Sequence, residues 1–397
     1  FQTVQRNRMF CFSESIEALH QRAREGRGLD DFGTDDYREA LERLCRSLDE
    51  DASLTPTGEM AMQQMIVDAL SARLMCEAGW RRLPEAREAR VERPLVIVGL
   101  PRTGTTALHH LIGQDPGFQA LEHWLLRTPK PRPPRDDWAA DPDFQAAAAR
   151  VDMMFARSPE MRAIHEIEAH LPDECWNLFA QNFLHSSYEA NADVAGYASW
   201  WASVDLTPVY RRHLRNVQLI GHREPERRWV FKDATHLFDA RALFEVYPDA
   251  LVVQTHRDPV RLIPSVCSLC WSAREALNTG TDAHVFGRST LALWERSIFS
   301  MMEARATQSP DRFYDLHFDR FIADPLAAIR DVYSTFDIPW TEAAETAMKR
   351  FRHAHPRGQH GAHRYHLEQW GLDADEIAER FRPYTEAYGV EPERASD

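Results

Sequence analysis

The sequence predicts an α/β fold, a P-loop-type parallel sheet flanked by helices, with a helical N-terminal extension. Short apolar runs rich in β-branched residues alternate with longer stretches in which apolar residues recur at helical spacing. At residues 95–112, one such run leads through a glycine-containing loop directly into a helical pattern. We therefore expect an extension at residues 1–90 and one larger domain at residues 91–397.

The composition disfavours some classes of binding partner. The 397 residues are 44% hydrophobic, enough for a sizeable core, and their formal net charge of −14 disfavours a nucleic-acid partner. Cys267 and Cys270, two of six scattered cysteines, are best interpreted as core thiols one helical turn apart. Because no leader-like segment opens the chain and no run of about 18 apolar residues occurs, we expect a cytoplasmic protein without a membrane span. The sequence leaves open whether the chain forms a homo-oligomer.

The extension is predicted to be helical. Residues Met60–Trp80 place apolar side chains at helical spacing, and the preceding Pro56 and Thr57 suit a helix start. No chemical motif occurs in residues 1–90. We interpret them as a cap that packs on the larger domain and helps to shape a pocket.

The stretch from Leu95 to Ile112 carries the first chemical signal. Gly99 and Gly104 bound a loop whose N–H groups meet the start of a helix, where a phosphate is favoured. Common NTPases have a lysine where this chain has Thr105, and the cation here is Arg102. The loop therefore suits a phosphate rather than a triphosphate with magnesium. Its candidate ligands are Gly99, Arg102, Thr103, Gly104, Thr105 and Thr106.

Residues 118–125 predict a second strand or its end. Glu122 and His123 lie at its carboxyl side, which is the ligand side of an open parallel sheet. Farther along, residues 141–190 are predicted to be helical. Within them, Asp173 and Glu174 follow a proline, and we interpret them as an N-cap and a solvated helix face.

Trp229–Phe231 predicts another buried strand, which ends at Lys232. The chain has three lysines, so a lysine at the carboxyl end of an apolar strand indicates a functional cation rather than solvated surface. His236, four residues farther on, is either a capping or core histidine or a functional imidazole. Both interpretations stay open.

The run Leu251–Thr255 predicts a strand that leads to Arg257, and Asp258 opens a helix that contains Ser265. A strand-end arginine and a helix serine can converge on a second phosphate through charge-assisted hydrogen bonds. A further strand is predicted at residues 312–318.

A histidine-rich segment at residues 353–366 precedes the last predicted helix, at residues 373–388. No carboxylate or cysteine is regularly spaced with these histidines, which disfavours a metal site. Arg357 and backbone N–H groups, including that of Gly358, instead favour an anion-binding loop.

In this order, the elements resemble the family of sulfotransferases that use 3′-phosphoadenosine-5′-phosphosulfate (PAPS), above all its broad bacterial group. The resemblance covers about residues 90–372. Residues 99–106 are similar to the family's 5′-phosphosulfate loop, and Lys232 resembles the lysine of its Lys-Ser-Pro or Lys-Asp-Pro element. Arg257 with Ser265 resembles its 3′-phosphate pair.

The resemblance implies that residues 91–397 form a catalytic domain. This domain would transfer the sulfuryl group of PAPS to a hydroxyl or amine of a small-molecule acceptor, with PAP as the product and no metal. An apolar or aromatic acceptor is expected ahead of a sugar, because residues 176–201 are rich in aromatic side chains. Arg102 and Lys232 would neutralise charge on the leaving phosphate.

By the same resemblance, Glu122 is the first candidate for the general base, followed by His123 and then His236. Two departures from the family pattern keep this assignment open. Lys232 is followed by Asp-Ala-Thr instead of a proline-containing element. Glu122 precedes a His-Trp pair, whereas many relatives carry Trp-Glu there.

The sequence leaves two other functions open. A P-loop kinase or NTPase would turn over ATP, although Thr105 replaces the required lysine and no convincing acidic magnesium site is evident. A nucleotide-binding protein that has lost catalysis would bind PAP without turning over any acceptor.

Overall fold

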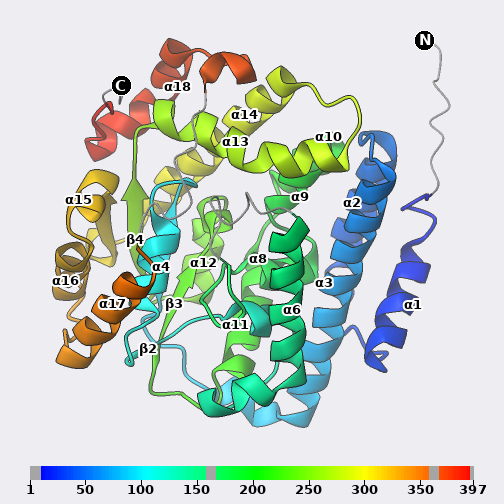
Figure 1. Ribbon diagram of the computed structural model, residues 1–397, viewed down its shortest axis with the longest axis horizontal. Helices are drawn as coiled ribbons and strands as arrows, with labels where there is room; N and C mark the ends of the chain where they lie inside the picture. The colour runs from blue at the N-terminus through cyan, green and yellow to red at the C-terminus, as the bar shows by residue number, and fades with distance from the viewer. Residues whose placement is uncertain (1–9, 158–166, 357–365, 394–397) are drawn as a thin grey trace.

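The computed structural model describes residues 10–157, 167–356 and 366–393 (Figure 1). These residues form a central sheet in which every neighbouring pair of strands is parallel, with the strand order β2-β3-β1-β4-β5. The strands are β1 (Leu95–Gly99), β2 (Phe118–Gln119), β3 (Arg228–Lys232), β4 (Leu251–His256) and β5 (Phe313–His317). Their carboxyl ends therefore lie along one edge, and the predicted α/β class is confirmed.

Helices account for most of the remaining described residues. The N-terminal helices are α1 (Ile16–Arg27), α2 (Arg38–Glu50) and α3 (Pro56–Arg82). Those up to β3 are α4 (Thr105–Ile112), α5 (His123–Arg127), α6 (Pro142–Arg157), α8 (Trp176–Phe179), α9 (Ser187–Asn191), α10 (Ala195–Trp201) and α11 (Thr207–Ile220). After β3 come α12 (Ala240–Val246), α13 (Pro259–Leu277), α14 (Ala283–Arg305), α15 (Phe318–Ala323), α16 (Pro325–Thr335), α17 (Glu342–Ala354) and α18 (Ala374–Tyr388).

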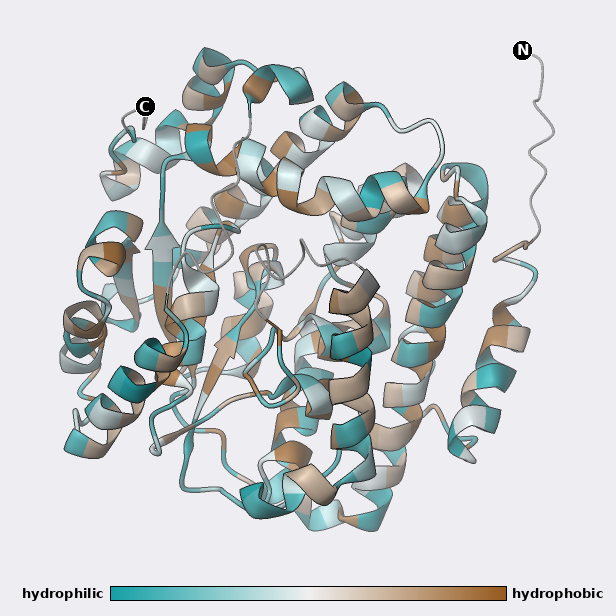
Figure 2. Cartoon of the chain, viewed as in Figure 1, coloured by the Kyte–Doolittle hydropathy of each residue, from teal (hydrophilic) through white to brown (hydrophobic). Residues whose placement is uncertain are grey.

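Strand β1 shows how the sheet is covered on both faces. Leu95 and Ile97 pack in a cluster with α4, α16 and α17, whereas Val96 and Val98 pack in a larger cluster that includes α1–α3. This division follows from the alternation of side chains along a strand. Since both faces are buried, the strand is a continuous apolar run, and brown stretches lie along the central strands in Figure 2.

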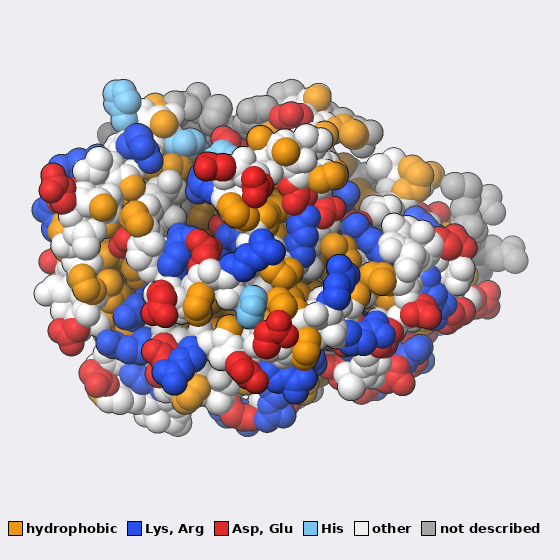
Figure 3. Space-filling model, turned by 90° about the horizontal axis from the view of Figure 1, so that it is seen from below, with side chains coloured by type: hydrophobic (Ala, Val, Ile, Leu, Met, Phe, Trp, Pro, Cys, Tyr) orange, Lys and Arg blue, Asp and Glu red, His pale blue; other side chains and the backbone are white. Residues whose placement is uncertain are grey.

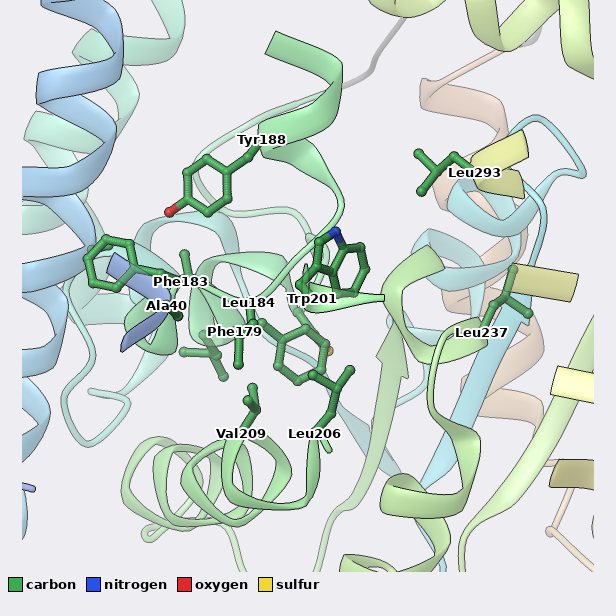
Figure 4. Close-up of a cluster of buried hydrophobic side chains, with 14 of the residues drawn as sticks. Ala40, Phe179, Phe183, Leu184, Tyr188, Trp201, Leu206, Val209, Leu237 and Leu293 are labelled. Carbon is green, nitrogen blue, oxygen red and sulfur yellow. The ribbon is translucent and has the colours of Figure 1, made fainter. Parts of the chain in front are cut away.

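The N-terminal helices are continuous with the rest of the core. Figure 4 shows Ala40 of α2 next to Phe183, within a cluster that also contains Val209 of α11. The side chain of Arg73 on α3 is fully buried, and it donates to the carbonyl oxygens of Phe32 (2.6 Å) and Gln181 (3.1 Å). The helices of residues 10–90 are thus joined to the later chain by apolar packing and by buried hydrogen bonds. The domain boundary near residue 90 stays a prediction.

One predicted element is wrong. Helix α8 begins only at Trp176, so Asp173 and Glu174 neither start a helix nor form a solvated face. Their segment instead runs beside the end of β2: Pro172 forms an isolated bridge with Glu122, and the N–H of Asp173 donates to the carbonyl of Leu121 at 2.8 Å. This backbone pairing turns both carboxylates into the protein.

The charged side chains on the surface and the thiols of α13 agree with what the composition predicts. On the face seen in Figure 3, basic and acidic side chains are interspersed with apolar ones. Cys267 and Cys270 lie on α13 as free thiols, and burial raises the pKa of Cys267 to about 12 and that of Cys270 to about 11, as expected for core thiols. In the part of the chain that the structure describes, no helix combines the length and the apolar character needed to cross a membrane.

Candidate active site

The loop between β1 and α4 has a backbone that is closely packed. A Cβ atom at Gly99 would lie 2.1 Å from Thr255 Oγ1, so a side chain there would collide with β4. Gly104 takes a φ of 88°, in the left-handed region that glycine tolerates, and immediately precedes α4. Arg102 also has a positive φ, 73°, which is uncommon for a residue with a side chain. The loop backbone is therefore held in a constrained conformation where it leads into the N-terminus of α4.

The three threonines of the loop have different surroundings. The hydroxyl of Thr103 is buried, donates to Leu100 O at 2.7 Å and lies 2.6 Å from Thr255 Oγ1. Thr105 is also buried, at the first position of α4. The hydroxyl of Thr106 accepts a hydrogen bond from Lys232 Nζ at 3.3 Å. Thr103 therefore secures the loop, whereas Thr106 links it to β3.

Lys232 lies at the carboxyl end of β3, beside β1, where its strand was predicted to end. It is 6% exposed, and its ammonium group forms an ion pair with Glu174 in addition to its contact with Thr106. Sequence reasoning missed Glu174 as a site residue. The lysine's place next to the phosphate-type loop gives this edge of the sheet a buried, paired cation.

The neighbouring Asp233 is almost completely buried. Its Oδ1 accepts the N–H of Thr235 at 2.6 Å, and its Oδ2 has no hydrogen-bond partner among the described residues. Burial, followed by repulsion from Glu174, raises the pKa of Asp233 to about 7. Two carboxyl groups and one lysine therefore share this part of the site.

His123 forms a dyad with Asp173. His123 Nδ1 lies 2.6 Å from Asp173 Oδ2, and both side chains are about nine-tenths buried. A carboxylate that accepts the Nδ1 proton orients the ring and leaves Nε2 as the unprotonated nitrogen. Asp173 also accepts the N–H of Glu174 at 2.6 Å, so the dyad and the Lys232–Glu174 pair are attached to consecutive residues.

Glu122 is paired with a different side chain. Its carboxylate accepts a hydrogen bond from Arg132 Nε at 3.0 Å, and Arg132 is 4% exposed. Glu122 also lines a cleft of about 300 Å³ together with Gly113, the residue that follows the C-terminal end of α4. Lys232, in contrast, contacts the first turn of that helix. The structure therefore pairs His123 with Asp173, and the carboxylate of Glu122 with Arg132.

His236 is completely buried among aromatic rings. Its Nδ1 lies 2.8 Å from the hydroxyl of Tyr210, and its ring contacts Phe179 edge-on at 5.4 Å between centroids. Burial, together with the nearby His213, lowers the pKa of His236 well below its usual value. The ring is therefore neutral and enclosed by the core.

The predicted second phosphate site comes together around Arg102. Arg102 Nε donates to Ser265 Oγ at 3.3 Å, and Arg257 Nη1 donates to the carbonyl oxygen of Arg102 at 3.0 Å. The guanidinium of Arg257 also lies over the ring of Phe318 at 4.1 Å and is bound by the carboxylate of Glu393. Arg357 and Gly358 lie outside the described residues, as does most of the predicted anion-binding loop.

This arrangement offers N–H groups, two arginines and a lysine along one sheet edge, next to an oriented imidazole. Such a set can bind a doubly phosphorylated ligand and move a proton. Across residues 10–157, 167–356 and 366–393, His, Cys, Asp and Glu side chains form no group of three or more suited to a metal ion.

Comparisons with known proteins identify the family of this chain. The profile described as "Sulfotransferase family" matches residues 94–342. The omega-hydroxy-beta-dihydromenaquinone-9 sulfotransferase Stf3 of Mycobacterium bovis is 25% identical over 284 residues, 65% of this chain and 67% of that protein.

Two solved structures extend the likeness over almost the whole chain. Sulfotransferase STF1 from Mycobacterium tuberculosis is 38% identical with a TM-score of 0.87, covering 94% of this chain and 100% of that one. Sulfotransferase STF9 from Mycobacterium avium is 26% identical with a TM-score of 0.88, covering 96% and 98%. The predicted resemblance is therefore confirmed, and the chain belongs to the sulfotransferase family.

Proposed function

We propose that this sulfotransferase takes its sulfuryl group from PAPS and transfers it to a hydroxyl of an apolar small-molecule acceptor, releasing PAP. The observation that carries the proposal is the convergence of Arg102, Ser265 and Arg257 beside the loop that leads into α4. One phosphate group would meet the loop N–H groups, and a second would meet Arg257 and Ser265. A donor with phosphates at both its 3′ and 5′ positions needs such a pair of sites.

The residues present fit this donor by their chemistry. The loop N–H groups, Arg102, Thr105, Thr106 and Lys232 would hold the 5′ side, where every group can donate a hydrogen bond. PAPS supplies an activated sulfuryl group whose leaving group is a phosphate. The contact of Lys232 with Thr106 supports this role, in which the lysine would stabilise the negative charge that grows on that phosphate.

We assign the general base to His123. Its Nδ1 is engaged by Asp173, which leaves Nε2 to accept a proton from the acceptor hydroxyl. Two observations favour it over the other two candidates. Glu122 is engaged by the buried Arg132, and His236 is enclosed by aromatic side chains.

An apolar acceptor is supported by one relative and by the apolar walls of a cleft beside α5. The printed name of the M. bovis relative gives a menaquinone derivative as its substrate. In this chain, α3, α8 and Tyr188 surround the region beside α5 with apolar side chains. A donor contact by Arg357 and Gly358, catalysis without a metal and a cytoplasmic location stay predictions.

Calorimetric titration with PAP, and separately with ADP and magnesium, tests the proposal. We expect PAP to bind at least tenfold more tightly than ADP with magnesium, because ADP lacks the 3′-phosphate that Arg257 and Ser265 would hold. A preference for ADP with magnesium would instead support a kinase or NTPase. PAP binding without turnover of hydroxylated apolar acceptors would support an inactive nucleotide-binding protein.

A further inference from the structure

A narrow cleft lies between α3, α5 and α8. Its apolar walls are formed by Met65 and Ala69 of α3, Leu126 of α5, Trp176 of α8 and, beyond it, Tyr188. The space open to a water molecule is about 30 Å³. The cleft therefore has room for about one or two small atoms, and the rest of a larger molecule would lie outside it.

Three polar side chains line this cleft with nitrogen atoms that have no hydrogen-bond partner among the described residues. They are His185 Nε2, Asn177 Nδ2 and Arg127 Nε. His185 is fully buried and Asn177 is 9% exposed. Buried polar groups in folded proteins are nearly always paired, so three in one cleft call for an explanation.

All three nitrogens are donors. Burial lowers the pKa of His185 to about 3, so the ring is neutral. Its Nδ1 accepts the backbone N–H of Ser187 at 3.1 Å, which places the single ring proton on Nε2. The Asn177 Nδ2 and Arg127 Nε atoms carry hydrogen by their chemistry. The missing partner is therefore an acceptor atom such as oxygen.

The charge of the cleft favours a neutral oxygen. Arg127 donates through Nη1 to Asp68 at 2.7 Å, and Asp68 also lines the cleft. The arginine charge is thus compensated, so the cleft has no unpaired cation to favour a carboxylate. A ketone, ester or quinone carbonyl on an apolar body matches both the donors and the walls.

The cleft adjoins the proposed catalytic groups along two segments. Arg127 lies on the same short helix as His123, about one turn away. Trp176 lies two residues after Glu174, which pairs with Lys232, and the intervening Cys175 donates its N–H to Lys232 O at 3.1 Å. The cleft is therefore built on the same two segments that carry the groups assigned to proton removal and donor binding.

From these observations we propose that the cleft is an acceptor subsite, which binds a carbonyl oxygen of the substrate through His185, Asn177 and Arg127. This inference rests on the proposed function, because it makes the acceptor of that reaction a carbonyl-bearing apolar molecule. The hydroxyl that receives the sulfuryl group would lie on the same molecule, outside the cleft and toward His123.

The test uses two probes of nearly the same shape, 2-methyl-1,4-naphthoquinone and 2-methylnaphthalene, titrated calorimetrically into the full chain with PAP present. The wild type is expected to bind the quinone at least about tenfold more tightly, the value of one or two hydrogen bonds. His185→Phe and Asn177→Leu should each reduce this preference to less than about threefold. His185→Gln, which restores an N–H donor, should recover part of it.

The matched control is His213→Phe. His213 is also fully buried with an unpartnered Nε2, but it lies on α11 and does not line the cleft. We expect this variant to keep the wild-type preference for the quinone. PAP affinity is also measured for each protein. A variant that fails to fold is recognised by its loss of PAP binding, and the conclusion then rests on the other cleft variant.

Three results would overturn the subsite: equal affinity for the two probes in the wild type, no binding of either probe, or a preference that survives both His185→Phe and Asn177→Leu. The third result would mean that the quinone owes its tighter binding to groups other than these donors. Failure of the wild type to bind PAP would instead contradict the proposed function, so the two failures are distinguishable.

Discussion

The carboxylate of Glu393 binds the guanidinium of Arg257 through two hydrogen bonds, at 2.6 Å from Nε and 3.0 Å from Nη2. The N–H of Glu393 donates to Asp258 Oδ2 at 2.9 Å, which holds the segment after α18 against the carboxyl end of β4. A carboxylate presents two oxygens to an arginine much as a phosphate does. The residue proposed to hold the 3′-phosphate is thus engaged by an anion from its own chain.

We predict that Glu393→Gln strengthens PAP binding by roughly fivefold. The donor's 3′-phosphate must replace or share with the Glu393 carboxylate, and removing this partly buried ion pair would return about 1 kcal/mol to binding. Calorimetry with PAP measures the change. Glu391→Gln, an exposed neighbour on the same segment, should leave PAP affinity unchanged. Weaker PAP binding by Glu393→Gln would show that the pair supports the site instead.

Arg257→Ala should weaken PAP binding by roughly 10- to 100-fold, the range expected for charge-assisted hydrogen bonds to a phosphate. AMP, which has no 3′-phosphate, serves as the matched ligand, and its affinity should change less than threefold. The ratio of the two dissociation constants therefore isolates the 3′ position. An equal loss for PAP and AMP would contradict the assignment of Arg257 and Ser265 to that phosphate.

Lys232→Ala should mainly reduce turnover, by roughly 100-fold or more, because the lysine would stabilise charge that develops on the leaving phosphate. PAP affinity is expected to fall much less than turnover, since the loop and Arg257 still hold both phosphates. Single-turnover rates with labelled PAPS separate the chemical step from binding. A loss confined to PAP affinity would move Lys232 from catalysis to ground-state binding.

Asp173→Asn should lower kcat by roughly 100- to 10,000-fold without weakening PAP binding. The variant removes the carboxylate that accepts the Nδ1 proton of His123, so the ring loses its orientation and the proton distribution that leaves Nε2 basic. The measurement is kcat against pH together with PAP affinity. If Glu122→Gln abolishes turnover while Asp173→Asn retains it, Glu122 is the base and our assignment is wrong.

Asp233 predicts a dependence of stability on pH. Its pKa is raised to about 7 in the folded protein, above a value near 4 in the unfolded chain. The folded state therefore holds this proton more tightly, so the associated stability is fully present below about pH 4 and is lost as the pH rises to about 7. The loss is at most about 1.4 kcal/mol per pH unit.

Asp233→Asn keeps an oxygen for the N–H of Thr235 but cannot ionise. Urea unfolding at pH 5 and pH 8 should therefore show the variant gaining stability relative to the wild type as the pH rises. A difference between the two proteins that stays constant with pH would mean that Asp233 does not titrate in this range.

Residues whose role follows from neighbours in the sequence could be predicted well. The strand that ends at Lys232 and the glycine loop before α4 are local patterns of apolar residues and turn residues, and both occur where expected. Arg257 directly follows β4 and Ser265 lies in the next helix, α13, so their approach to the loop follows from parallel pairing of β1 and β4. These elements also carry the resemblance to sulfotransferases.

Asp173 and Glu174 could not be assigned in this way. Their partners His123 and Lys232 lie 50 and 58 residues away in the sequence, and nothing in the local pattern distinguishes a buried carboxylate from a solvated cap. Glu122 illustrates the converse. It has the sequence position of a base, yet its carboxylate is paired with the buried Arg132, which lies 10 residues farther along the chain.

The sequence by itself determined the α/β class, the phosphate-type loop and the family, because these depend on periodicity and on short motifs. Only the tertiary structure decided which titratable groups meet, namely His123 with Asp173 and Lys232 with Glu174. The physical reason is that an ion pair or a buried hydrogen bond depends on distance in space and on burial. Both quantities arise only when segments distant in the chain pack together.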